Sequence, residues 1–173
     1  MAVAAVVLAA GAASRFGAPK QILLLPDVLA RVRASGIEEI VVVTGAYAFE
    51  TEARTVHCTD WELGPGASLR CGLAALSPTA EAAVVVLADG PGLASAAILH
   101  VVAAWRRENA SVVAASYGGV RGHPLLLARA AWADVPDEGL RGRDPLLVPC
   151  DDFGEPGDVD RPADLPERFG PPA

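Results

Sequence analysis

The sequence has few residues of several types, and each shortage argues against a class of protein. Only one of its 14 basic residues is a lysine, and 21 acidic residues give a net charge of −7. A protein that binds nucleic acid by neutralising phosphates needs clustered Lys and Arg, so we expect no nucleic-acid partner. No apolar run reaches the roughly 18 residues of a membrane-spanning helix, so we expect no membrane contact either.

Cysteine is scarce as well. The three cysteines, Cys58, Cys71 and Cys150, are odd in number and show no CxxC or Cys-His spacing. This pattern supports neither a disulfide framework nor a zinc site, and we expect all three to be small buried hydrophobic residues. The apolar start, Met1 to Ala13, lacks the preceding basic residues of a secretory signal. We interpret it as a strand and loop of a cytoplasmic protein.

Short apolar runs alternate with helical patterns along the 173 residues. The runs are Ala2 to Leu8, Ile40 to Thr44, Ala83 to Leu87 and Ser111 to Ala115. Unalternated runs of this length are typical of parallel strands buried on both faces. Apolar spacing near 3.6 predicts helices at Val28 to Ser35 with Asp27 as cap, at Ser68 to Leu76 and at Ala94 to Glu108. The alternation predicts one domain, 1–173, with a three-layer α/β sheet.

The regular pattern ends at about Gly118. The segments that follow are rich in Gly, Pro and Arg, without a clear helical or strand period, and we expect them to shape the site of a second substrate. In an open α/β sheet ligands bind beyond the carboxyl ends of the strands, at Gly11 to Lys20, Gly45 and Asp89 here. The stretch Gln21 to Glu39 barely holds a crossover, so its helix should be short.

The segment VVLAAGAASRFGAPKQ, Val6 to Gln21, carries the strongest chemical signal. It is not a Walker A loop, because five residues separate its two glycines and Ser or Thr does not follow the lysine. It also lacks the GxGxxG of dinucleotide-binding folds. Its small side chains would let the N–H groups of Ala10 to Ser14 face an anion, with Arg15 and Lys20 at the rim.

We therefore interpret this loop as a polyphosphate cradle, with an ordinary strand-to-helix turn as the alternative. The only lysine of the chain, Lys20, lies in it. Lysine is a compact point charge, whereas arginine presents a fork of donors, so this placement favours the functional interpretation.

One carboxylate is expected at the same edge of the sheet. Asp89 comes directly after an apolar run, where a Mg²⁺ ion bridging phosphates would bind, although it could instead cap the next helix. Asp158 and Asp160 in GDVDRPADL form a second pair, of which Asp160 could cap a helix after Pro162.

LAAGAASRFGAPK, Leu8 to Lys20, resembles the LAAGxSxRFGxxK signature of the molybdenum cofactor cytidylyltransferases, within the wider MobA-like nucleotidyltransferases. Further segments are similar in order: WELGPGASLRCGL to WxxGxxxSLxxGL, LADGP to LADMP or LADQP, RGHPLLL to GHPVLL, and GDVDRPADL to DIDTPEDL. The resemblance covers nearly the whole chain. It departs at Gly90, where the family has Met or Gln, so we expect the pocket wall beside Asp89 to differ from the family's.

The resemblance implies a three-layer α/β/α Rossmann-like nucleotidyltransferase fold with a mostly parallel sheet, a nucleotide-binding half, 1–116, and an acceptor-binding half, 117–173. By resemblance, Arg15 and Lys20 are catalytic. The residues that would bind the nucleotide are Leu8, Ala9, Ala10, Gly11, Ser14, Gly66 and Ser68. Those that would bind Mg²⁺ are Asp89, Asp158 and Asp160, and those that would clamp an anionic acceptor are Arg121, His123 and Arg141. Ser68 could equally be a helix N-cap, and His123 a structural histidine.

The reaction implied is transfer of CMP from CTP to the phosphate of molybdopterin, with release of pyrophosphate. It needs no general base, because a phosphate monoester is already ionised at neutral pH and catalysis reduces to alignment and charge neutralisation. Ala10 in LAAG matches the cytidylyl branch, whereas guanylyl relatives, which use GTP, commonly show LAGG. The alternatives are a transferase of the same fold with another phosphorylated acceptor and a nucleotide-binding regulatory protein without turnover. A dinucleotide-dependent oxidoreductase is less favoured.

Overall fold

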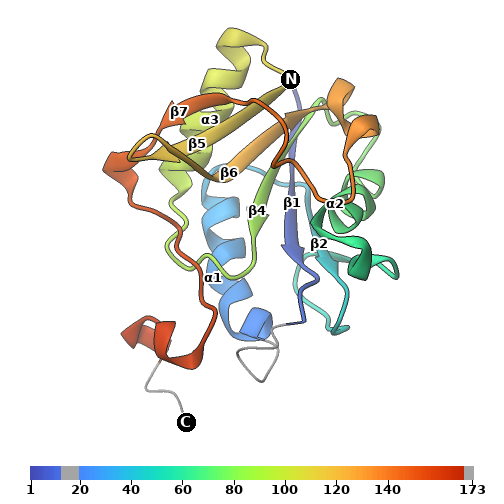
Figure 1. The fold of residues 1–173 in the computed structure, drawn as a ribbon, viewed down its shortest axis with the longest axis vertical. Coiled ribbons are helices and arrows are strands. Elements are labelled where there is room, and N and C mark those ends of the chain that lie inside the picture. The colour runs from blue at the N-terminus through green and yellow to red at the C-terminus, as the bar shows by residue number, and fades with distance from the viewer. Residues whose placement is uncertain (13–19, 170–173) are drawn as a thin grey trace.

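The computed structural model describes residues 1–12 and 20–169, which form a seven-stranded sheet with helices on both faces (Figure 1). The strand order is β3-β2-β1-β4-β6-β5-β7. The strands are β1 (Val3–Ala9), β2 (Ile40–Thr44), β3 (Arg54–His57), β4 (Ala82–Leu87), β5 (Val112–Tyr117), β6 (Val120–Ala128) and β7 (Leu146–Pro149). The α-helices are α1 (Lys20–Ala34), α2 (Pro65–Ala74) and α3 (Ser95–Glu108).

The sheet is mostly parallel, as predicted. Strand β6 runs antiparallel to its neighbours β4 and β5, while the other pairings among the described strands are parallel. The predicted three-layer Rossmann-like fold is therefore confirmed. None of the helices in residues 1–12 and 20–169 is long and apolar enough to cross a membrane.

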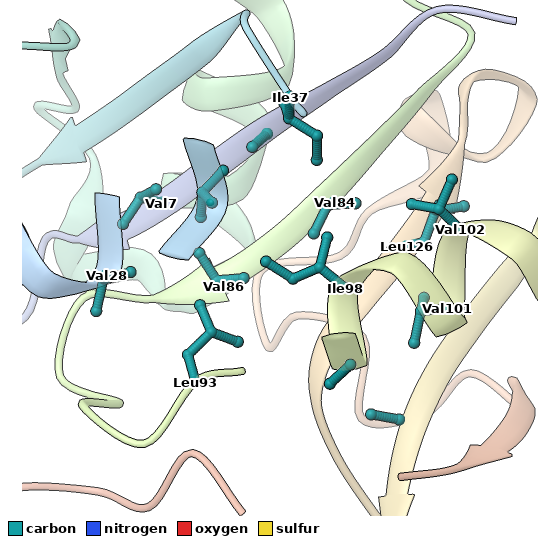
Figure 2. Close-up of a cluster of buried hydrophobic side chains, with 14 of the residues drawn as sticks. Val7, Val28, Ile37, Val84, Val86, Leu93, Ile98, Val101, Val102 and Leu126 are labelled. Atoms are coloured by element: carbon teal, nitrogen blue, oxygen red, sulfur yellow. The ribbon is translucent and has the colours of Figure 1, made fainter. Parts of the chain in front are cut away.

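The apolar runs fill two cores because side chains alternate across a strand. Val7 of β1 points to the face covered by α1 and α3, and its neighbour Val6 points to the face covered by α2. Figure 2 shows the first of these cores, with Val28 of α1 and Ile98 of α3 near the sheet. A strand that is buried on both faces has apolar residues in succession, without alternating polar ones. This explains why the ends of β1, β2, β4 and β5 could be predicted to within about two residues.

Helix α1 differs from the prediction. It begins at Lys20 rather than at Val28 and runs for 15 residues, with Pro26 inside it, so the expectation of a short helix capped by Asp27 was wrong. An internal proline costs about 3 kcal/mol. The helix buries Leu24, Leu25 and further apolar residues along the same face, each worth about 1.5–3 kcal/mol, and this burial outweighs the proline.

The irregular second half also contains strands that the sequence pattern concealed. Strand β6 spans nine residues, but the register between β5 and β6 shifts between Ala114 and Ser116, so Gly122 to Pro124 do not follow a simple period of two. Only Leu125 to Leu127 form a buried apolar run in it. The tight connection from β5 uses Gly118 and Gly119, both at positive φ.

The expectation that no disulfide forms was wrong. The structure joins Cys58, which follows β3, to Cys71 of α2, with their Cα atoms 5.8 Å apart. The packing of α2 on the sheet brings the two sulfur atoms together, and a separation of 13 residues carries no local motif that would reveal this pairing. Cys150 is a free buried thiol, as expected.

Candidate active site

The carboxyl ends of β1 and β4 open into a cavity of about 530 Å³, called cavity 1 here. Seven of the residues singled out from the sequence line it together: Leu8, Ala10, Gly11, Lys20, Ser68, Asp89 and Asp160. Ala9 points instead into the core beneath the sheet. Ser14 and Arg15 lie outside the described residues. The predicted clustering at the strand ends is thus present in the described part of the chain.

Lys20 lines cavity 1, with only 7% of its side chain exposed. Its Nζ is 2.8 Å from Asp89 Oδ2 and 3.6 Å from Asp160 Oδ1, and it also donates to the carbonyl of Val159. A buried charge without partners would cost several kcal/mol, and these acceptors are what allow the ammonium to be buried.

The C-terminal segment completes the cavity. After β7 the chain runs back past the lower end of β4 (Figure 1), where the N–H of Val159 donates to the carbonyl of Asp89 at 3.2 Å. Asp160 is not a helix cap, because Arg161 caps the short 3-10 helix Pro162–Asp164. Asp89 does not cap α3 either, since that position belongs to Ala94. Both carboxylates are therefore committed to the cavity rather than to capping.

These carboxylates fit a divalent cation that also binds phosphates. Asp89 and Asp160 direct oxygen atoms to one point, which Lys20 Nζ occupies. Within residues 1–12 and 20–169 no group of three or more His, Cys, Asp or Glu side chains could hold a metal alone. Mg²⁺ is usually held by one or two carboxylates, with substrate phosphates and water completing its oxygen shell. The donor set matches that arrangement.

Asp158 faces a second cavity of about 470 Å³, called cavity 2. Desolvation, followed by the charges of Asp89 and Asp160, raises the pKa of Asp158, while Lys20 lowers it. Asp158 therefore belongs electrostatically with the two other carboxylates although it lines a different cavity. Leu87 lies in the walls of both cavities, so they adjoin.

The three residues predicted to bind the acceptor come together in cavity 2. Arg121, His123 and Arg141 line it, and they also line a third cavity of about 440 Å³. The Arg121 guanidinium donates to the carbonyls of Leu140 and Arg143 at 2.8 and 3.0 Å, so it fixes the loop that carries Arg141. Burial lowers the pKa of Arg121.

His123 lies in this wall as a neutral imidazole. Burial and the nearby charge of Arg121 lower the pKa of His123 to about 4, against the opposing effect of Asp89. The hydroxyl of Tyr117 donates to the His123 carbonyl at 2.9 Å and anchors this part of β6. At neutral pH His123 can therefore donate or accept a hydrogen bond but supplies no charge.

Gly66 and Ser68 have different roles in the structure. A Cβ atom at Gly66 would lie 1.7 Å from the carbonyl oxygen of Pro136, so close packing of the loop on α2 requires glycine there. Gly66 is not among the residues that line cavity 1, whereas the buried Ser68 is. The interpretation of Ser68 as an N-cap was wrong, because Gly64 holds that position.

Five residues that line cavity 1 were missed, and Gln21 and Trp61 are the two of them whose contacts shape it: the five are Gln21, Trp61, Gly64, Pro65 and Leu87. The side chain of Gln21 is buried and its Nε2 donates to the Gly11 carbonyl at 3.0 Å, which fixes the end of the β1 loop. Trp61 packs so closely on Gly45 that a Cβ atom there would lie 2.7 Å from the Trp61 side chain. The sequence held a signal for each of these two residues: Gln21 is a polar residue directly after Lys20, and Trp61 is the first residue of the WELGPG motif.

Comparisons with known proteins identify the family and the fold of this chain. Over residues 5–144 the sequence matches the family described as MobA-like NTP transferase domain. The comparison with curated proteins found no match. The homologue of Mycobacterium tuberculosis Rv0371c from Mycobacterium sp. strain JC1 is 28% identical, with a TM-score of 0.75 over 92% of this chain and 90% of that chain.

Two more solved structures extend the comparison. Rv0371c from Mycobacterium tuberculosis H37Rv in complex with manganese is 26% identical, with a TM-score of 0.64 over 86% of this chain and 89% of that chain. A CMP:2-keto-3-deoxy-manno-octonic acid synthetase complexed with CTP shares the fold alone, at 11% identity and a TM-score of 0.71 over 98% and 97% of the chains. Because the family match spans well over half of its length, this chain belongs to the MobA-like NTP transferase family and is a nucleotidyltransferase of that type.

Proposed function

We propose that this protein transfers CMP from CTP to the phosphate of molybdopterin and releases pyrophosphate. The observation that carries the proposal is cavity 1, where the LAAG end of β1, Lys20, Asp89 and Asp160 face one another. An oxygen of the acceptor phosphate attacks the α-phosphorus, and the bond from the α-phosphorus to the oxygen bridging it to the β-phosphate breaks. The phosphate of the acceptor is already ionised. The site therefore needs to align the two substrates and neutralise the charge of their phosphates, and it does not need to remove a proton.

The nucleotide would lie along the end of β1. Backbone groups of Ala10 and Gly11 and the hydroxyl of Ser68 line the cavity and would contact it, while Ser14 and Arg15 stay assigned to it by resemblance. The LAAG form of the loop favours CTP over GTP. Such substrates are cytoplasmic metabolites, and we place the protein in the cytoplasm.

Asp89 and Asp160 would hold Mg²⁺, with Asp158 on the acceptor side. When bound, the ion would neutralise the charge that develops on the reacting phosphates. The manganese complex of a relative supports a divalent cation in this family. The three residues around cavity 2, Arg121, His123 and Arg141, would hold the acceptor, whose phosphate would reach the nucleotide beside Leu87.

A second candidate is a transferase of the same fold that acts on another phosphorylated acceptor. Gly90 favours it, because this residue lines cavity 2 where the family signature has Met or Gln. The missing side chain changes the shape of the acceptor wall while Asp89 beside it is kept.

Pyrophosphate release tests the proposal, measured with CTP, GTP or ATP in the presence of Mg²⁺ and molybdopterin. We expect release with CTP, a loss of kcat of about 10²-fold or more in Lys20→Ala by analogy with lost oxyanion donors, and loss of release in Asp89→Ala. Arg33→Ala, which removes an exposed ion pair with Glu52, is the matched control and should keep full activity.

The other outcomes separate the alternatives. Release with GTP alone would overturn the interpretation of Ala10. Nucleotide binding without release would favour the regulatory protein or a different acceptor, and a panel of phosphorylated acceptors would then separate those two.

A further inference from the structure

Lys20 contacts the groups that the metal should contact. The sequence pattern assigns it to the triphosphate, yet its Nζ lies 2.8 Å from Asp89 Oδ2 and 3.6 Å from Asp160 Oδ1. Its side chain is 7% exposed, against 24% for Asp89 and 53% for Asp160. The ammonium is thus the best buried member of the cluster, and both carboxylates face it.

A divalent cation would compete for the same oxygen atoms. Mg²⁺ binds carboxylate oxygens at about 2.0–2.1 Å, so an ion on both Asp89 and Asp160 would lie within a few ångströms of Lys20 Nζ. Two positive charges this close repel each other, and the burial of Lys20 limits the screening by solvent. Ammonium and metal therefore cannot both hold the pair of carboxylates in the arrangement seen here.

We propose that Lys20 is an internal counter-ion, which holds Asp89 and Asp160 in the nucleotide-free protein and leaves them to the metal when a triphosphate arrives. The inference rests on the proposed function, because it requires nucleotide and metal to meet in cavity 1. The triphosphate supplies the ammonium with a new anionic partner, so the exchange leaves no charge unpaired. The metal and the nucleotide should consequently bind with positive coupling.

The chemistry of lysine suits this exchange. Its ammonium is a compact charge on a flexible stem, whereas an arginine fork would favour a fixed bidentate pair. Lys20 also donates to the carbonyl of Val159, whose N–H is bonded to Asp89. The ammonium thus holds the C-terminal segment at the end of β4 until the metal can bind both carboxylates.

Binding of Mn²⁺ to the nucleotide-free protein tests the inference, measured by the electron paramagnetic resonance signal of free Mn²⁺ and by calorimetry. Lys20→Met keeps the length of the side chain without its charge and should bind Mn²⁺ at least about tenfold more tightly than wild type. Lys20→Arg keeps the charge and can hold the carboxylates at least as firmly, so it should bind Mn²⁺ no more tightly than wild type. Arg33→Met changes the net charge equally at an exposed ion pair with Glu52 and should also resemble wild type.

A second measurement uses the wild-type protein, so it does not depend on how the variants fold. Lys20 is the only lysine, and isotope labelling of lysine therefore gives the NMR signal of a single side chain. Its Cε and Nζ resonances should change little with Mg²⁺ alone and shift when CTP and Mg²⁺ are added together. Thermal melting of each variant checks that it is folded.

The outcomes distinguish this inference from the proposed function. Equal Mn²⁺ affinity of Lys20→Met and wild type, with an unchanged lysine signal in the presence of CTP and Mg²⁺, would overturn the counter-ion role even if CMP transfer occurs. Tighter Mn²⁺ binding by Lys20→Met, with no response of any variant to CTP, would keep Lys20 as the competitor of the metal and reject CTP as the nucleotide.

Discussion

Single residues of this site take their chemistry from their surroundings, and His123 shows this most directly. Its pKa is lowered to about 4 by burial and Arg121, whereas an unfolded chain holds it near the ordinary 6.5. Above pH 6.5 both states are neutral. Between pH 6.5 and 4 the unfolded chain binds a proton that the folded protein does not, so folding stability falls as the pH falls through this window.

We therefore expect the free energy of unfolding to fall between pH 7 and pH 4.5 more steeply in wild type than in His123→Gln. The pKa difference corresponds to at most about 3 kcal/mol, and the variant should remove that part of the slope. Urea unfolding at a series of pH values measures it. Parallel curves for His123→Gln and wild type would contradict the prediction.

At the scale of elements, the disulfide closes one wall of cavity 1. The segment from Cys58 to Cys71 contains four residues that line the cavity, namely Trp61, Gly64, Pro65 and Ser68. A bridge over a loop of this length stabilises a protein by about 3 kcal/mol, mainly through the unfolded chain. We expect dithiothreitol to lower the melting temperature and to weaken nucleotide binding.

Thiol titration of the denatured protein shows which form is present, because the oxidised chain has one free thiol and the reduced chain has three. In the double variant Cys58→Ala/Cys71→Ala, melting should no longer respond to dithiothreitol. Cys150→Ala should respond as wild type does. A wild-type melting temperature that is the same with and without dithiothreitol would refute the stabilising role. A reducing cytoplasm would favour the thiol form, so this experiment also bears on the proposed location.

The elements differ in how far the sequence could predict them. The strands buried on both faces could be predicted from their unalternated apolar runs, and the position of Asp89 after β4 could be predicted from the same pattern. Helix α1 was predicted too short because Pro26 hides an apolar stripe that continues past it. Strand β6 was concealed by its irregular register, and the partner of Cys58 depends on how α2 packs. Those three features are decided by contacts between distant segments, which a local pattern does not contain.

The site shows the same division. The pattern of strands placed Lys20 and Asp89 at one edge of the sheet, the family resemblance added Asp160, and the structure brings the three together. The ion pairs of Lys20 with Asp89 and Asp160 were not predicted, because Lys20 was expected to face phosphates and the two carboxylates were expected to bind Mg²⁺. The need for glycine at position 66 could not be predicted either. It depends on the carbonyl oxygen of Pro136, which lies far along the chain from Gly66.

For the whole molecule, the expected nucleotide-binding and acceptor-binding halves are interleaved. Strand β6 of the second half lies between β4 and β5 of the first half. Cavity 1 likewise takes Asp160 from the second half. Removing residues 117–173 would remove β6 from between β4 and β5 and leave backbone N–H and C=O groups of both strands unpaired. We therefore expect residues 1–116 to be unable to fold alone and the full chain to unfold in one step.

Two tryptophans allow this prediction to be measured. Trp61 lies beside cavity 1 in the first half and Trp132 lies in the second. Variants that keep only one of them, with the others changed to Phe, report urea unfolding of each half by fluorescence, and circular dichroism reports the helices. We expect all midpoints to coincide and a bound nucleotide to raise them together, because it binds only the folded state. Separate midpoints for the two tryptophans would instead show that the acceptor half unfolds on its own.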